Sequence, residues 1–111
     1  MKAILAFVLF AMLGTGCRKN YLSEPECILS SVESFKKTAI CDHGASVNVY
    51  EFAGRTVYVF DPGNCGADMQ AKVLDANCRL LGVLGGIAGN TKIDGVEFSS
   101  NSYYLRTVWS N

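Results

Sequence analysis

Four cysteines spread through a short chain constrain the fold more than any other feature of this sequence. The chain has 111 residues and five cysteines, and Cys17 ends a segment of the export-signal type. The other cysteines form an even set in an exported domain, which predicts two disulfides. A four-cysteine zinc site is the alternative. It usually has paired C-x-x-C knuckles, whereas successive cysteines from Cys27 onward are 14, 24 and 13 residues apart, and this spacing favours disulfides.

Residues 1–16 have the layout of a bacterial lipoprotein signal peptide. A lysine is followed by an uninterrupted apolar run over residues 3–13, and small residues lead into Cys17. Gly14 stands where such signals usually have leucine. The alternative is an ordinary secretory peptide cut between Gly14 and Gly16, which would leave Cys17 as a free thiol. We expect cleavage before Cys17, its acylation, and attachment of the chain to a membrane through the acyl groups.

The apolar run is too short to remain as a membrane span, because its helix would measure about 17 Å against a hydrocarbon core of about 30 Å. Residues 17–22 then form a tether that reaches at most about 20 Å. Residues 23–111 are enough for one small domain. Arg18 and Lys19 follow the cysteine without an acidic residue, and we expect the periplasmic side of the outer membrane.

The charge pattern argues against a nucleic-acid partner. The formal net charge is zero, and the sequence has no basic stripe or charge block. Eleven glycines and an aromatic content of 11% favour a turn-rich domain that contains β-strands.

Residues 23–40 predict one amphipathic helix near the N-terminus of the domain. Ser23 and Glu26 have the spacing of a capping box, and Pro25 falls in the first turn, where its missing N–H is tolerated. Apolar residues then recur at helical spacing: Ile28, Val32, Phe35 and Ala39. We expect the helix to end near Ile40, with Asp42, His43 and Gly44 as its stop signal.

Strand patterns follow the helix. Residues 46–52 and 55–60 are rich in valine and aromatic residues, and Ala53 and Gly54 separate them as a two-residue hairpin turn. Val57 and Val59 point to one face of this hairpin, whereas Tyr58 and Phe60 point to the other. Both sets are apolar, so we expect both faces to be at least partly covered.

A second hairpin is predicted from residues 71–75 and 79–83, and residues 103–109 alternate as a closing strand. Residues 85–90 read as an irregular glycine-rich loop. The predicted fold is therefore α+β, with one N-terminal helix packed on a four- to five-stranded, mostly antiparallel sheet and stabilised by disulfides.

This fold constrains the pairing of the cysteines. Cys27 and Cys41 lie at opposite ends of the predicted helix, about 21 Å apart, and cannot bond without unwinding it. Cys41 precedes the first strand and Cys65 follows the second, so the hairpin brings them together. Cys78 lies in the next hairpin turn, at the end of the sheet to which Cys27 should return. We predict the disulfides Cys41–Cys65 and Cys27–Cys78.

The blocks Asp61–Met69 and Leu81–Asn90, with residues 57–60 before them and an aromatic C-terminus, carry a resemblance. Over about residues 27–109 the chain resembles an uncharacterised family of small lipoproteins common in Bacteroidota. The resemblance implies export and lipidation. It implies no catalytic residue, because that family has no assigned activity.

The loop 61–68 holds the main candidates for ion or ligand binding. Asp61, Asn64 and Asp68 carry oxygen ligands that suit calcium, but the EF-hand pattern is absent. A simple turn pinned by Cys65 explains the same residues and is favoured.

No other pattern indicates catalysis or a cofactor. His43 is the only histidine and lies in the predicted helix-ending turn, so no Ser/His/Asp or Cys/His arrangement can be assembled. The glycine-rich loop 85–90 lacks the ending of a phosphate-binding loop, and tight turns explain its glycines. Tyr103 and Tyr104 face opposite sides of their strand, so we expect one of them to be exposed, and Tyr104 is a further binding candidate.

The expected function is therefore a non-catalytic binding or accessory domain of the cell envelope, anchored in the membrane through acylated Cys17. One form of this hypothesis is an inhibitor or partner of an envelope enzyme, with the glycine-rich loop and the Cys65 loop as its contact surface. The rival is a calcium-dependent binder or small enzyme that uses the Asp61–Asp68 loop. Carriage of a small ligand needs a pocket of several hundred Å³, which so small a core can rarely spare.

Overall fold

The computed structural model describes residues 24–38 and 40–111. The predicted signal peptide, Cys17, the tether and Ser23 lie outside these residues. None of the helices in the described ranges is long and apolar enough to cross a membrane.

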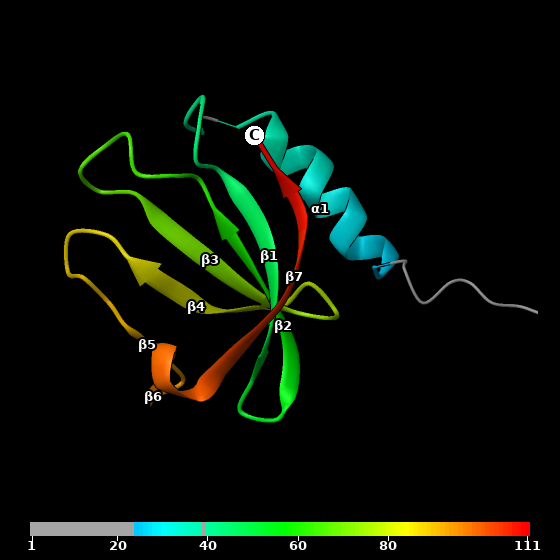
Figure 1. Cartoon of the computed structure of the whole chain (residues 1–111), viewed down its shortest axis with the longest axis vertical. Coiled ribbons are helices and arrows are strands. Elements are labelled where there is room, and N and C mark those ends of the chain that lie inside the picture. The colour runs from blue at the N-terminus through cyan, green and yellow to red at the C-terminus, as the bar shows by residue number, and fades with distance from the viewer. Residues whose placement is uncertain (1–23, 39) are drawn as a thin grey trace, which may run out of the picture.

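The domain is built on a five-stranded antiparallel sheet with the strand order β4-β3-β2-β1-β7 (Figure 1). Both predicted hairpins and the closing strand are confirmed, with ends within two residues of those expected. The strands of this sheet are β1 (Ser46–Phe52), β2 (Arg55–Asp61), β3 (Gln70–Asp75), β4 (Leu80–Gly85) and β7 (Ser102–Ser110).

The first hairpin turns at Ala53 and Gly54, whose φ angles are 50° and 86°. Two consecutive positive φ angles are typical of the tight turn whose twist matches that of its strands. At the far edge, β7 pairs with the free side of β1, with register shifts between Val47 and Asn48 and between Val49 and Tyr50. The sheet therefore places the last strand beside the first.

Helix α1 (Glu26–Lys36) is shorter than expected at both ends. Pro25 is its N-cap and no side chain caps it, so Glu26 is the first helical residue and the capping-box prediction is wrong. The predicted end near Ile40 is also wrong. The hydroxyl of Thr38 donates to the Phe35 carbonyl, and the Cys41 N–H donates to the Pro62 carbonyl at 2.9 Å, so the chain leaves the helix early to reach the sheet.

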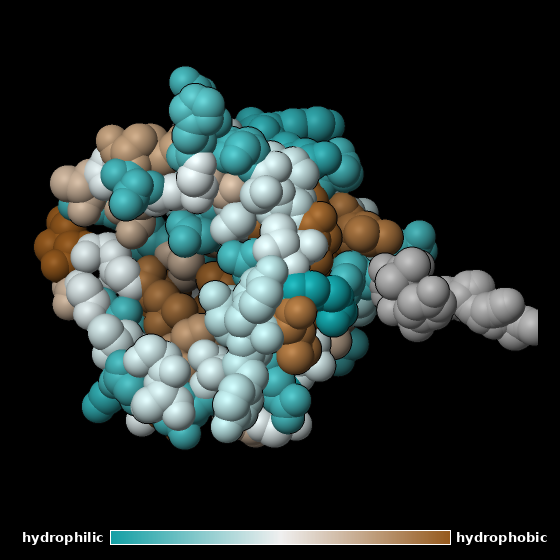
Figure 2. Space-filling view, viewed as in Figure 1, coloured by the Kyte–Doolittle hydropathy of each residue, from teal (hydrophilic) through white to brown (hydrophobic). Residues whose placement is uncertain are grey.

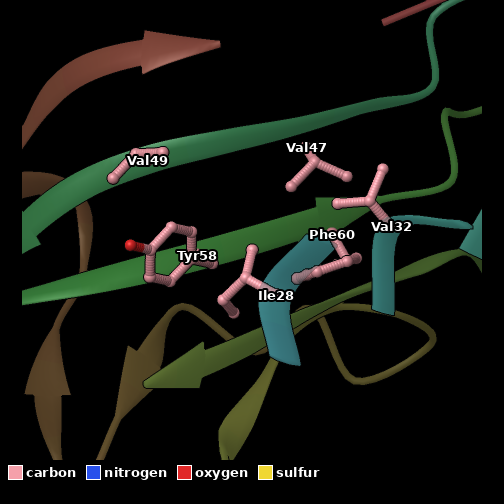
Figure 3. Packing of buried hydrophobic residues seen from close by; sticks show 6 residues of the cluster. All are labelled: Ile28, Val32, Val47, Val49, Tyr58 and Phe60. Carbon is pink, nitrogen blue, oxygen red and sulfur yellow. The ribbon is translucent and has the colours of Figure 1, made fainter. Parts of the chain in front are cut away.

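One core lies between α1 and the sheet. Ile28 and Val32 from the helix pack on the strand face that carries Val47 and Val49 of β1 (Figure 3). Tyr58 and Phe60 of β2 complete this face, as the alternation of residues 57–60 predicted. At the edge of the cluster the ring of Phe35 meets the rings of Phe60 and Trp109 edge to face, with centroids 5.4 Å and 6.1 Å apart.

A second core lies on the opposite face of the sheet. A small hairpin of β5 (Lys92–Ile93) and β6 (Val96–Glu97), followed by the short 3₁₀ helix η2 (Ser99–Asn101), covers this face. These elements were not predicted from the sequence. The buried members of this cluster are Phe52, Val57, Val59, Val73, Ile93 and Phe98. Both faces are thus covered, as predicted.

The two predicted disulfides, Cys27–Cys78 and Cys41–Cys65, are confirmed. Their Cα atoms are 6.1 Å and 5.7 Å apart, respectively. The first joins the start of α1 to the β3–β4 turn, and the second joins the chain before β1 to the loop after β2. The disulfides therefore lie at opposite ends of the sheet.

Candidate functional site

Two loops lie side by side at one end of the sheet, and we call this region the loop end. It comprises residues 62–69, between β2 and β3, and residues 86–90, after β4 (Figure 1). The Gly86 N–H donates to the Met69 carbonyl at 3.1 Å. The predicted contact surface, the Cys65 loop with the glycine-rich loop, is thus continuous in space.

Local hydrogen bonds and one disulfide hold the first loop in place. Asp61 Oδ1 accepts the Gly63 N–H at 2.9 Å, which closes a turn of the kind that aspartate side chains favour. The Cys41–Cys65 disulfide ties the loop to the chain before β1. Gly63 has a φ of 101°, and a Cβ added there would lie 2.8 Å from the Cys41 Cβ. Only glycine fits this close approach.

The glycine-rich loop is closed by a pair of backbone hydrogen bonds. Gly85 donates to the Asn90 carbonyl at 2.8 Å, and Asn90 donates back at 3.1 Å. The Asn90 side-chain amide also donates to the carbonyls of Val83 and Lys92. Gly85, Gly86 and Gly89 have positive φ, so their role is conformational, as the sequence reading favoured.

A cleft of about 400 Å³ opens beside the loop end, on the sheet face opposite α1. Its volume lies within the range of small-ligand sites, and it is mostly apolar with a few polar groups, as such sites are. Figure 2 shows apolar residues at the floor of a hollow on the molecular surface. The cleft is lined by Tyr50, Val59, Asp61, Gly63, Asn64, Met69, Ala71, Leu84, Gly85 and Phe98.

Tyr50 is the central aromatic side chain of this region. Its ring packs edge to face on Phe98 and on Tyr104, with centroids 5.2 Å and 5.9 Å away. Burial, with smaller effects from Tyr104 and Asp61, raises the pKa of the Tyr50 phenol above its ordinary value. The cleft therefore presents a neutral phenol next to a carboxylate.

The structure brings together only part of the predicted ion-binding loop. Asp61 and Asn64 both line the cleft, whereas Asp68 is exposed and is not among its lining residues. Calcium takes about six to eight oxygen ligands. No group of three or more His, Cys, Asp or Glu side chains placed to hold a metal occurs within residues 24–38 and 40–111.

The two adjacent tyrosines of β7 are both exposed, although only one was expected to be. Tyr103 is 73% exposed and Tyr104 57%. The difference arises because β7 is an edge strand, whose faces are less covered than those of β1. The Tyr104 hydroxyl shares a hydrogen bond of 2.7 Å with Thr107. His43 lies exposed in the bend before β1, outside the cleft.

Sequence reasoning missed the role of Phe98 and the exposure of Ile87. Phe98 follows the unanticipated β5–β6 hairpin, whose turn at Asp94 and Gly95 has positive φ at both residues. An Asp-Gly pair between apolar residues is a strong hairpin signal and could have revealed it. Ile87 is 83% exposed in the glycine-rich loop, and Figure 2 shows an apolar patch at the edge where Figure 1 places this loop.

A second groove, of about 360 Å³, runs between α1 and the outer strands on the other face. Its walls are Ser31, Ser34, Phe35 and Thr38 of the helix side and Phe60, Lys72, Leu74 and Leu80 of the sheet. Both hollows are open to the surface.

Comparison with known proteins gives one family match. A family model described as a domain of unknown function (DUF6970) matches residues 33–111, which covers most of the described domain. No curated protein and no solved structure matches the chain.

Proposed function

The chain belongs to the DUF6970 family of domains of unknown function, and we propose that it is a lipid-anchored, non-catalytic binding domain of the cell envelope. In this proposal the loop end contacts a partner protein, and acylated Cys17 holds the domain at the membrane. The partner we favour is an envelope enzyme, which the domain inhibits or assists.

The observation that carries this proposal is the fixed arrangement of the two loops. The Cys41–Cys65 disulfide ties down one loop, the Gly85–Asn90 hydrogen bonds close the other, and Gly86 joins them through Met69. Loops that are ordered before binding lose less entropy when a partner docks. An exposed large apolar side chain, Ile87, beside an apolar cleft then offers the anchor-and-pocket chemistry of protein interfaces.

The cleft suits an inserted side chain of the partner. Tyr50 and Phe98 offer aromatic walls, and Asp61 with Asn64 offers polar groups at the rim. A partner residue with an apolar body and a polar or cationic end matches these walls and this rim.

The anchoring half of the proposal rests on the sequence and on the cysteines. The signal-like residues 1–16 end at Cys17, and the two disulfides are of the kind that persists in exported proteins.

The proposal is tested by placing a photo-crosslinking amino acid at Ile87 in the full chain and irradiating intact cells. We expect a discrete crosslinked adduct that contains one partner protein. The matched control is the same amino acid at Leu80, which is 55% exposed but lies on the opposite face of the sheet. The control should give no such adduct.

A second measurement separates recognition from chance proximity. Ile87→Asp should reduce recovery of the partner, whereas Leu80→Asp should leave it unchanged. No reproducible adduct from Ile87, or equal adducts from both positions, would overturn the proposed use of the loop end.

A further inference from the structure

Both α1 and β7 carry exposed apolar side chains on the flank where these two elements meet, far from the loop end. Leu29 of α1 is 43% exposed and Leu105 of β7 is 45% exposed, and Tyr103 lies beside them on the strand. We call Leu29, Tyr103 and Leu105 the helix–β7 flank.

A bidentate ion pair places this flank at the point where the chain enters the domain. The Arg106 guanidinium donates to both oxygens of the Glu24 carboxylate at 2.8 Å. Leu105, between Tyr104 and Arg106, is the extra residue at the register shift of β7 against Val49 and Tyr50, on the outer edge of the sheet. On β1, Glu51 pairs with Tyr103 and Val49 pairs with Arg106. Because Glu51 and Val49 are two residues apart on one strand, they lie on the same face of the sheet, and so do their partners Tyr103 and Arg106.

Leu29 lies on the β7 side of the helix. The Lys36 ammonium lies 5.8 Å from the centre of the Trp109 ring, so this side of α1 faces β7. Leu29 is seven residues earlier, two helical turns, and therefore lies on the same side. The opposite side, with Ser31 and Thr38, borders the groove above β3 and β4.

The chain outside the structure limits how far this flank lies from a membrane anchor. Glu24 is seven residues after Cys17 in the sequence, and this stretch of chain spans at most about 25 Å when fully extended. We propose that the helix–β7 flank is a docking surface for the bilayer interface; this proposal rests on the acylation of Cys17 in the proposed function. The acylated chain then lies against the lipid through Leu29, Tyr103 and Leu105.

The chemistry of the flank matches that interface. Tyrosine has an apolar ring and a polar hydroxyl, and it is enriched where lipid headgroups meet the hydrocarbon. The Glu24 carboxylate, at the first residue that the structure describes, is paired with Arg106. Arg18 and Lys19 of the tether add positive charge that anionic headgroups attract.

This orientation also leaves the loop end accessible. The entry point lies near the start of α1, where Cys27 bonds to Cys78 in the β3–β4 turn. The loop end lies at the other end of the sheet, with Cys65. Figure 1 shows the start of α1 on one side and the two loops on the opposite side. The docked domain thus presents its loops away from the membrane.

The test is hydroxyl-radical footprinting of the acylated full chain, after signal cleavage, on vesicles of phosphatidylethanolamine and phosphatidylglycerol. The reference is the Cys17→Ser protein free in solution. We expect labelling of Leu29, Tyr103 and Leu105 to fall severalfold on the vesicles. Tyr104 and Ile87, which point elsewhere, serve as internal controls and should label equally in both samples.

A double variant, Leu29→Glu with Leu105→Glu, should remain on the vesicles through its acyl groups but regain full labelling at Tyr103. The matched control Ile87→Glu should keep Tyr103 protected. Uniform labelling of the acylated protein would overturn the docking proposal alone. Protection of Tyr104 or Ile87 instead, or protection of Tyr103 in concentrated Cys17→Ser protein, would overturn it as well. An N-terminal peptide without acyl mass would overturn both this proposal and the anchoring on which it rests.

Discussion

Glu24 and Arg106 form a bidentate ion pair, with two hydrogen bonds of 2.8 Å, that joins the segment before α1 to the last strand. The Glu24 side chain is largely buried, whereas Arg106 is half exposed. The Tyr58 hydroxyl donates to the same carboxylate at 3.3 Å. The pair therefore holds the N-terminal helix against the far edge of the sheet.

This pair makes the stability of the domain sensitive to acid. The hydrogen bonds that Arg106 donates to Glu24 hold the pKa of the Glu24 carboxyl below the ordinary value of 4.5, although burial of the carboxyl opposes this effect. A carboxyl whose pKa is lower in the folded than in the unfolded protein stabilises the fold at pH values above the unfolded-state pKa. This contribution is lost as the pH falls through the folded-state pKa. Glu24→Gln should remove about 1–2 kcal/mol from the free energy of unfolding at pH 7.

The measurement is urea unfolding of the wild type and Glu24→Gln from pH 7 down to pH 3. The difference between them should shrink below pH 4.5, the ordinary value. The control is Glu33→Gln, which removes only the surface ion pair with Lys36. This substitution should change the free energy of unfolding little at any pH. A constant difference between wild type and Glu24→Gln would show that the ion pair is not responsible.

The two disulfides should contribute similarly to stability but differently to binding. They close loops with sequence separations of 51 and 24 residues, for which chain entropy gives about 3–4 kcal/mol each. Replacing either pair with serines should lower the free energy of unfolding by that amount. Only loss of Cys41–Cys65 should also weaken partner capture by the loop end. Equal loss of capture from both double variants would argue that the loops are positioned by global stability alone.

Two glycines of the same loop separate backbone strain from side-chain overlap. Gly86 and Gly89 both have positive φ, but a Cβ at Gly86 would lie 2.7 Å from the Gln70 amide nitrogen, whereas one at Gly89 meets nothing within 4 Å. Gly89→Ala should therefore cost about 1–2 kcal/mol from backbone strain alone. Gly86→Ala should cost more, as measured by the midpoint of denaturant unfolding. Equal losses would mean that Gln70 moves aside freely.

Ile93 tests the importance of the unanticipated β5–β6 hairpin. Its side chain is fully buried in the core opposite α1, so Ile93→Ala should lower the free energy of unfolding by about 2–5 kcal/mol. Ile87→Ala, in the exposed loop, is the matched control and should have almost no effect. If Ile93→Ala were equally mild, the hairpin would not be part of the cooperative unit.

Much of this fold could be predicted because its signals are local. Ala53 and Gly54 between two apolar runs identify the first hairpin. Because Cys41 precedes the first strand of this hairpin and Cys65 follows the second, the hairpin also predicts that these two cysteines pair. The limits of α1 could not be predicted in this way. The interaction that draws the chain away from the helix, Cys41 with Pro62, joins residues far apart in sequence and competes with helical propensity.

The cleft was less predictable for a related reason. Its walls come from four strands (β1, β2, β3 and β4), from the β2–β3 loop and from the segment after β6, and no sequence motif spans such a set. The Asp61 loop was identified as a candidate because its turn residues are consecutive. Tyr50 and Phe98 meet only after the β5–β6 hairpin folds over the sheet, and their proximity depends on long-range packing.

Titration of the tyrosines tests the environment of the cleft directly. Burial raises the pKa of Tyr50, with Tyr104 and Asp61 adding to the effect, and burial likewise raises the pKa of Tyr58 beside Glu24. Absorbance at alkaline pH should show these two phenols ionising above 10.0, the ordinary pKa of a tyrosine. Because a neighbouring negative charge disfavours the phenolate, Asp61→Asn should bring only the Tyr50 step to lower pH, whereas Glu24→Gln should shift only the Tyr58 step. Tyr50→Phe identifies which late step belongs to the cleft. A late step that responds equally to both carboxylate variants would contradict the placement of Asp61 at the cleft beside Tyr50.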